Sequence, residues 1–369
     1  MNFDPNKPFN DLPNLPPKGF DLDNKEILKI SLEASEAIGA LRAMARSDIH
    51  NILHALHMMT PLFVPEAVAS SSVENIITTN EQVYRALIEK KNELSPNEKE
   101  AINYVKALSK GMEIMNLKGS LATNGYLEIQ KILEPSKSGL RKLPGTVLSN
   151  PISKKVFYTP PVGEKLIRDL LSNFDNYFNE VAPQHEVYAR MAILHYQFEA
   201  IHPFYDGNGR TGRMLMPLYL MRQQKLDLPI LFISRYILQN RDEYYQKLRA
   251  VTYEQKWKEW IIFIIKATVE QAKYTESILE KIQRTVEYVK NNLDSRFPHI
   301  PSKEVVDFIF SEAYFDTAGF QKNLKVSYIT ARKYLHALES SGLVVKKKQD
   351  GRNRFIFANP SYIKILKET

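Results

Sequence analysis

The sequence predicts a mainly α-helical protein with one small β-hairpin in its middle and a second hairpin in a C-terminal domain. Three observations lead to this fold class. Apolar residues recur at helical spacing through most of the chain, extended apolar segments flank turn residues at two places, and positive charge gathers near the C-terminus. At 369 residues the chain is longer than one hydrophobic core usually supports, so we expect two or three domains.

Composition narrows the class of protein. Hydrophobic residues make up 44% and charged residues 25% of the chain, which is a globular rather than a disordered balance. Cysteine is absent, which excludes a disulfide scaffold and a thiolate metal site. The first 23 residues are proline-rich and lack the features of a signal peptide, and no apolar run is long enough to span a bilayer. We therefore expect a cytoplasmic protein with no membrane partner.

The expected elements begin with a proline-rich arm, because proline blocks helix and sheet hydrogen bonding. Helical spacing follows over residues 24–80, and Ser95 marks the start of a helix that runs to about Met115. Helical spacing resumes later and continues to about Lys290. Between these regions a short hairpin is predicted from Val147-Leu148, the turn pair Asn150-Pro151 and Val156-Phe157-Tyr158.

The C-terminal region predicts two helices followed by a hairpin. Ser327 caps the second helix, and Gly342 ends it. The apolar residues that define these elements are Val305, Ile309 and Phe310, then Ala331, Leu335 and Leu338, then Leu343-Val344-Val345 and Phe355-Ile356-Phe357 around the turn Asp350-Gly351. This order, with basic residues on the second helix and the hairpin, is a winged-helix pattern.

Most of the excess positive charge lies in this region. Residues 320–354 contain nine Lys or Arg and two acids, and so carry +7 of the formal net charge of +8. The cluster indicates an anionic partner such as DNA, although a solvated strand end is the plainer interpretation of Lys346 to Lys348. Thr330, Lys333 and His336 would point away from the apolar helix face, toward a DNA groove.

The richest segment chemically is His202-Pro203-Phe204-Tyr205-Asp206-Gly207-Asn208-Gly209-Arg210-Thr211-Gly212-Arg213. Its glycines precede a helical pattern, so backbone N–H groups at the start of that helix would form an anion site. Arg210 and Arg213 add forks for phosphate oxygens, and Asp206 is an oxygen ligand suited to Mg²⁺. His202 could take a proton from a hydroxyl. Phosphoryl-type transfer needs this set of groups.

Two plainer alternatives compete for the same segment. Gly207-x-Gly209-x-x-Gly212 fits the dinucleotide-binding fingerprint, and Asp227 lies 20 residues beyond the first glycine. That fingerprint requires a preceding buried strand, whereas residues 187–201 have helical spacing. The other alternative is a surface turn, which needs neither a histidine before it nor two arginines after it.

Residues His202 to Arg213 also resemble the signature of the Fic family, and every fixed position matches. Tyr158-x-Pro160-Pro161 resembles the end of the family's target-binding flap, and Asn240-Arg241 through Tyr244-Tyr245 resembles the segment near its adenine pocket. The resemblance covers roughly residues 95–270. It implies a helical fold, ATP as donor, and transfer of AMP to a Ser, Thr or Tyr hydroxyl of a target protein or of the protein itself.

The resemblance also implies a role for each matching residue. His202 would be the general base, Asp206 would hold Mg²⁺, and Phe204 would be a buried anchor. The phosphates would be held by Gly207, Asn208, Gly209, Arg210 and Arg213. The candidates for the adenine pocket are Asn240, Tyr244 and Tyr245. Residues 246–253 offer no asparagine for the base, which is a departure from the family pattern.

An upstream segment, Ser70-Ser71-Ser72-Val73-Glu74-Asn75, resembles the family's inhibitory motif. There the glutamate pairs with the second signature arginine, here Arg213, because a carboxylate mimics a phosphate for the same fork. The resemblance implies an autoinhibited enzyme. Taken alone, Glu74 would be a solvated helix residue, and within the family it could instead align a water that removes AMP from targets.

We expect four regions: an arm and helical region with the inhibitory motif over 1–94, a Fic catalytic core over 95–275, a linker helix over 276–295 and a winged-helix domain over 296–369. The alternative function is a DNA-binding transcriptional regulator whose Fic core senses nucleotide. The sequence names no target protein, and a homodimer stays open. His50, His54 and His57 have a helical spacing that can bind metal, but with one acid nearby a packing role is favoured.

Overall fold

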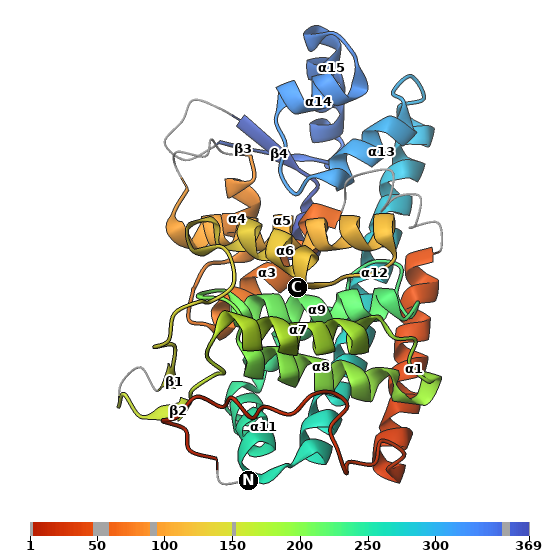
Figure 1. Cartoon of the computed structure of the whole chain (residues 1–369). Coiled ribbons are helices and arrows are strands. Elements are labelled where there is room, and N and C mark those ends of the chain that lie inside the picture. Colours follow the sequence, from red (N-terminus) through yellow and green to blue (C-terminus); the bar gives the residue numbers. More distant parts are fainter. Residues whose placement is uncertain (1–2, 47–58, 89–93, 150–152, 349–354, 369) are drawn as a thin grey trace. The chain divides into compact units, whose positions relative to one another are not determined.

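The computed structural model describes residues 3–46, 59–88, 94–149, 153–348 and 355–368. Within these residues the protein is mainly helical and carries two antiparallel hairpins, which confirms the predicted fold class (Figure 1). None of the helices described is long and apolar enough to cross a membrane. The chain forms two compact units, residues 1–42, 69–76 and 103–273 in the first, and 43–68, 77–102 and 274–369 in the second. The domain boundaries drawn from the sequence stay a prediction.

The first unit is built around α8 (Val187–Ile201) and α9 (Asn208–Arg222), which pack against each other, with α7 (Glu164–Asn179) beside α8 (Figure 1). Helix α8 buries nearly every side chain because its apolar residues occupy all faces. Rings around α7 and α8 pack edge to face or stacked, and they belong to Tyr126, Phe174, Phe178 and Phe198. This packed core fixes the short loop that joins α8 to α9.

The other elements confined to the first unit are α6 (Thr123–Leu133), η2 (Pro135–Lys137), β1 (Leu148–Ser149), β2 (Val156–Tyr158), η3 (Gln184–Glu186), α10 (Ile233–Gln239) and α11 (Arg241–Glu254). Four helices continue along the chain from one unit into the other: α1 (Lys25–Arg46), α3 (Met59–Val73), α5 (Pro96–Lys118) and α12 (Trp257–Arg296). Ser95 caps α5 as predicted, since its Oγ accepts from the N–H of Glu98 at 3.3 Å.

The N-terminal arm, residues 3–23, contains no helix or strand and is held against the β1–β2 hairpin, or flap. The N–H of Phe9 donates to the carbonyl of Thr159 at 3.0 Å, and the hydroxyl of Thr159 donates to the carbonyl of Pro5 at 2.7 Å. The ring of Phe3 stacks on Tyr158 and meets Tyr253 edge to face. The arm therefore packs against the flap and is hydrogen-bonded to the residue that follows β2.

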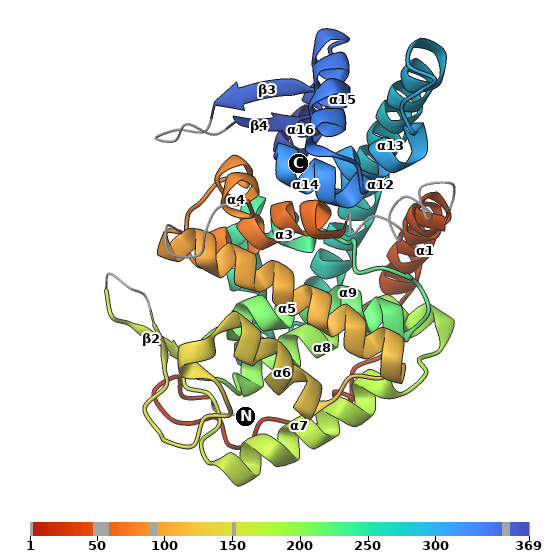
Figure 2. The same cartoon turned by 90° about the horizontal axis from the view of Figure 1, so that it is seen from above.

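The second unit contains α4 (Asn80–Ala86), α13 (Ser302–Ser311), α14 (Thr317–Leu324), α15 (Tyr328–Ser340), β3 (Val345–Lys348), β4 (Phe355–Ala358) and α16 (Pro360–Glu368), and Figure 2 shows its hairpin beside α15. Ser327 caps α15 by accepting from the N–H of Thr330 at 3.1 Å, and Gly342 follows with a φ of 76°. Both predicted helices, here α13 and α15, and the predicted hairpin are present, whereas α14 and α16 were not predicted. The turn Asp350-Gly351 and the three spaced histidines of the N-terminal region lie outside the described residues.

Candidate active site

The loop between α8 and α9 is closed by its own side chains. Helix α8 ends at Ile201 and is capped by His202, whose backbone adopts a left-handed φ of 49°. Phe204 is fully buried, and both ends of the Asn208 amide bond its backbone at 2.8 Å. Gly207, with a φ of 77°, then starts α9. Left-handed backbone at a non-glycine residue costs roughly 1–3 kcal/mol and concentrates at functional sites.

This geometry decides between the alternatives for the segment. A helix precedes the glycines, so the segment is not a dinucleotide-binding fingerprint after a strand. Asp227, which that interpretation needed, pairs with Arg42 at 2.9 Å. The segment is not a solvent-exposed turn either, because Arg210 and Arg213 are almost completely buried.

His202 lies in an environment that keeps its ring uncharged. Burial and the positive charge of Arg141 lower the pKa of His202 to about 4, although Glu74 and Asp206 act in the opposite direction. Arg141 also holds the loop, because its Nε donates to the carbonyl of His202 at 2.6 Å and its Nη2 to that of Pro161 at 2.9 Å. A neutral imidazole at pH 7 can accept a proton.

The two signature arginines are held by carboxylates. Arg213 donates from Nη2 to Oε1 of Glu74 at 2.8 Å, and from Nε to the hydroxyl of Ser70 at 2.9 Å. Arg210 donates to Oε2 of Glu74 at 3.2 Å and to Glu134 at 2.8 Å. A Cβ built on Gly209 would lie 2.6 Å from Oε1 of Glu74, so the Glu74 carboxylate lies directly against the start of α9.

The carboxylate of Asp206 forms an ion pair with a lysine side chain. Its Oδ2 pairs with the ammonium group of Lys137, its Oδ1 accepts from the N–H of Gly207 at 2.8 Å, and its pKa is lowered by Lys137, Gly207 and Arg210 although burial alone would raise it. A carboxylate that already faces a positive charge suits Mg²⁺, which takes one or two protein carboxylates and completes its shell with phosphate oxygens and water. No group of three or more His, Cys, Asp or Glu able to hold a metal occurs in the described ranges.

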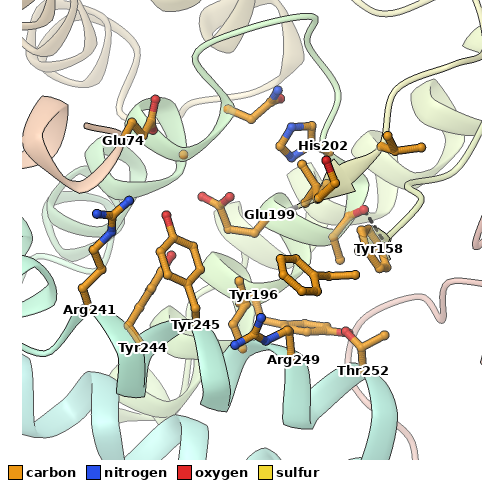
Figure 3. A pocket seen from close by; sticks show the side chains of 18 of the residues that line it. Glu74, Tyr158, Tyr196, Glu199, His202, Arg241, Tyr244, Tyr245, Arg249 and Thr252 are labelled. Atoms are coloured by element: carbon orange, nitrogen blue, oxygen red, sulfur yellow. Dashed lines mark hydrogen bonds between the residues drawn. The ribbon is translucent and has the colours of Figure 1, made fainter. Parts of the chain in front are cut away.

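These residues surround a cavity of about 850 Å³ in the first unit, which is within the usual size for a small-molecule site. Figure 3 shows Glu74 and His202 on two sides of it and Tyr244 and Tyr245 on the wall formed by α11. The flap contributes Leu148, Ser149 and Phe157 to the lining.

The structure brings most of the predicted site residues together. The cavity lining includes Glu74, His202, Asp206, Gly207, Asn208, Gly209, Arg213, Tyr244 and Tyr245. Arg210 is not part of the lining and instead binds the carboxylates of Glu74 and Glu134. Asn240 is also outside the lining, and its amide donates to the carbonyl of Tyr236 at 2.9 Å. The amide of Asn208 closes the loop, so that residue can offer a phosphate its backbone N–H rather than its side chain.

Sequence reasoning missed four residues at this site: Lys137, Glu134, Arg141 and Glu199. The first three lie more than 60 residues before the signature, and no short pattern links them to it. Glu199 could have been predicted from the sequence, because a residue three positions before His202 in a helix lies on the same helix face as His202.

Comparisons with known proteins agree with this geometry. The model of the Fic/DOC family matches residues 120–220, that of the Fic/DOC family N-terminal region matches 28–113, and that of the protein adenylyltransferase SoFic-like C-terminal domain matches 282–362. A Fic family protein from Desulfovibrio desulfuricans G20 shares the fold with a TM-score of 0.58 at 18% identity, covering 91% of this chain and 96% of that one.

Curated relatives match over the signature region. A protein adenylyltransferase Fic of Culex quinquefasciatus is 40% identical over 93 residues, which are 24% of this chain and 17% of that protein. The chain thus matches only about a sixth of the length of the adenylyltransferases it resembles. A Fido domain-containing protein of Dictyostelium discoideum is 34% identical over 107 residues, which are 29% of this chain and 69% of that protein. With the signature loop, its surrounding helices and these matches together, the chain belongs to the Fic/DOC family.

Proposed function

We propose that the protein transfers AMP from ATP to a hydroxyl group of a target protein and that Glu74 inhibits this activity in the same chain. The observation that carries the proposal is the loop at the start of α9, where His202 and the buried Arg213 line a nucleotide-sized cavity. The relatives named protein adenylyltransferase support the choice of reaction.

In this reaction the hydroxyl oxygen of the target forms a bond to the α-phosphorus of ATP. The bond from that phosphorus to the oxygen bridging the β-phosphate breaks, and pyrophosphate leaves. The imidazole of His202 accepts the hydroxyl proton, for which its lowered pKa keeps it neutral. N–H groups at the start of α9 and the guanidinium of Arg213 stabilise the phosphate charge. A Mg²⁺ ion held by Asp206 would supply further charge neutralisation on the phosphates.

Inhibition follows from competition for Arg213. The guanidinium already binds Glu74 and Ser70, so a γ-phosphate that uses the same donors must first displace the Glu74 carboxylate. Displacement also has to break the contact of Arg210 with Glu74. While Glu74 stays on Arg213, ATP would bind with its α-phosphate away from the line of attack, which slows transfer.

The test compares labelled-AMP incorporation by four full-length proteins: the parent, Glu74→Gly, Glu74→Gly with His202→Ala, and the control Glu33→Gly. Glu33 lies on an exposed face of α1, so the control makes the same chemical change away from the site. We expect Glu74→Gly to raise incorporation into lysate proteins or into itself, and His202→Ala to abolish it while ATP still binds. Equal activity of parent and Glu74→Gly, with ATP bound to both, would contradict inhibition by Glu74. Retained transfer without His202 would contradict its role as base.

A second candidate function is binding of duplex DNA by α15 and the β3–β4 hairpin. Arg332, Lys333 and His336 are exposed on α15, while Ala331, Leu335 and Leu338 are buried on its other face. On β3 the exposed side chains are Lys346 and Lys348. Basic side chains on a capped helix and a neighbouring hairpin are suited to phosphate contacts, which release counterions. In this case the Fic region would respond to nucleotide in a regulator.

A further inference from the structure

One carboxyl group in the cavity has no part in the proposed transfer. Glu199 lies on α8, one turn before His202, and Figure 3 shows its carboxyl directed into the cavity, between His202 and Tyr245. Its Oε1 is buried and has no hydrogen-bond partner among the residues the structure describes. Burial raises the pKa of Glu199 to about 7, with Arg213 opposing and Glu74 assisting the shift. A buried polar atom without a partner is costly, so a bound ligand is the natural source of one.

The backbone of α9 is shaped around this carboxyl. A Cβ built on Gly212 would lie 2.4 Å from Oε1 of Glu199, a distance that real atoms do not tolerate. The absence of a side chain at Gly212 therefore leaves room for the end of the Glu199 side chain beside α9.

The position of Glu199 identifies the part of a nucleotide it can meet. The start of α9 with Arg213 provides the phosphate end of the cavity, and Tyr244 and Tyr245 on α11 provide an aromatic wall for the base. The sugar of a nucleotide joins its base to its phosphates, and Glu199 lies between these two walls. In dinucleotide-binding folds an Asp or Glu carboxylate accepts a hydrogen bond from the ribose 2′-hydroxyl, so a carboxyl is chemically suited to this contact.

We propose that Glu199 binds the 2′- and 3′-hydroxyls of the ribose and so makes the site selective for ribonucleotides over deoxyribonucleotides. The assignment rests on the proposed nucleotide site. The ribose hydroxyls donate to the Glu199 carboxyl, the end of a side chain that can turn from Gly212 toward the cavity it lines. Glu199 is a specificity-determining residue and takes no part in proton transfer.

The experiment measures binding by calorimetry, so that it does not depend on transfer. The full-length Glu74→Gly protein with His202→Ala serves as reference, because it leaves the phosphate site open and does not consume the nucleotide. ATP, 2′-deoxy-ATP and 3′-deoxy-ATP are titrated into the reference and into the same protein carrying Glu199→Ala or Glu199→Gln. The control Glu33→Ala makes the same chemical change at an exposed position of α1, away from the cavity.

We expect the reference and the control to bind ATP about tenfold more tightly than at least one deoxy analogue, the effect of losing one hydrogen bond to a charged group. With Glu199→Ala this ratio should fall to about one, and Glu199→Gln should restore part of it because its amide oxygen still accepts. An unchanged ratio in Glu199→Ala would overturn the ribose assignment alone, and so would an equal loss of affinity for all three nucleotides. Failure of the reference to bind any of them would overturn the nucleotide site and the assignment together.

Discussion

Glu81, in the short helix α4, gives a quantitative prediction about the second unit. Its carboxylate accepts from the hydroxyl of Tyr314 at 2.7 Å and from Arg85 at 2.8 Å, and it pairs with Lys367 of α16. Burial alone would raise the pKa of Glu81, but these three partners lower it from 4.5 to about 2. The cluster joins α4 to the last helix of the chain.

The pKa of Glu81 sets the size and the pH range of the effect. A fall from 4.5 to about 2 corresponds to about 3 kcal/mol of stabilisation, taken as an upper bound. Because the folded-state pKa is lowered, this contribution is complete above the unfolded value of 4.5 and is lost as pH falls toward 2. At pH 3 less than half of it should remain. Glu81→Gln removes the charge with little change in shape and should therefore destabilise the cluster most at pH 7.

Hydrogen exchange read by mass spectrometry is the suitable assay. Trp257 and Trp260 both lie in the first unit, so intrinsic fluorescence would not report on α4 or α16. Peptides covering these two helices should exchange faster in Glu81→Gln than in the parent at pH 7, with a smaller difference at pH 3. Glu304→Gln, at an exposed position of α13, is the matched control. Equal protection at pH 7, or a difference that grows toward acid, would refute the reasoning.

Three other changes have defined outcomes. Lys137→Met should lower the Mg²⁺ concentration needed for ATP binding several-fold, because the ammonium competes with the metal for Asp206; an unchanged midpoint in a Mg²⁺ titration at fixed ATP would contradict this. Deleting residues 1–10 should speed hydrogen exchange in β2 but not in α8, because the arm's hydrogen bonds to residue 159 are lost. An unchanged exchange rate in β2 would show that the arm does not stabilise the flap. Arg332→Glu with Lys333→Glu should abolish salt-sensitive retention on duplex DNA, and a parent protein that is not retained at low salt would end the DNA proposal.

The active-site loop could be located from the sequence because its chemistry is local. His202, the glycines and the arginines occur within twelve residues, and their side-chain types specify an anion site with a base. The partners that tune this loop come from distant segments. Lys137 and Arg141 approach it only because α6 and the residues after it pack beside α9, which no periodicity reveals.

The missed helices have a similar explanation. Helices α14 and α16 have eight and nine residues, too few for a periodic apolar pattern to stand out. Local signals were nevertheless present. Asp316 caps α14 by accepting from the N–H of Gly319 at 2.7 Å, and Pro360 occupies the first position of α16.

The carboxylates of Glu74 and Glu134 also stabilise the two signature arginines when no nucleotide is bound. Arg213 and Arg210 are buried, and an uncompensated buried charge costs about 3–5 kcal/mol. In the proposed mechanism Glu74 takes the place of a phosphate group in both stability and inhibition, and Glu74→Gly should lower the melting temperature of the first unit. The loss should stay below that range, because Glu74 helps to raise the pKa of Glu199, and without Glu74 an ionised Glu199 partly neutralises Arg213.

ATP should reverse this loss, since a ligand that binds only the folded state stabilises it by an amount that rises with the logarithm of its affinity. The thermal shift caused by saturating ATP is thus expected to be larger in Glu74→Gly than in the parent, where part of the binding energy is used to displace the carboxylate. Differential scanning calorimetry at fixed protein and ATP concentrations measures both quantities. A Glu74→Gly protein as stable as the parent, with no greater shift on adding ATP, would show that Arg213 does not depend on the carboxylate, and inhibition would then need another cause.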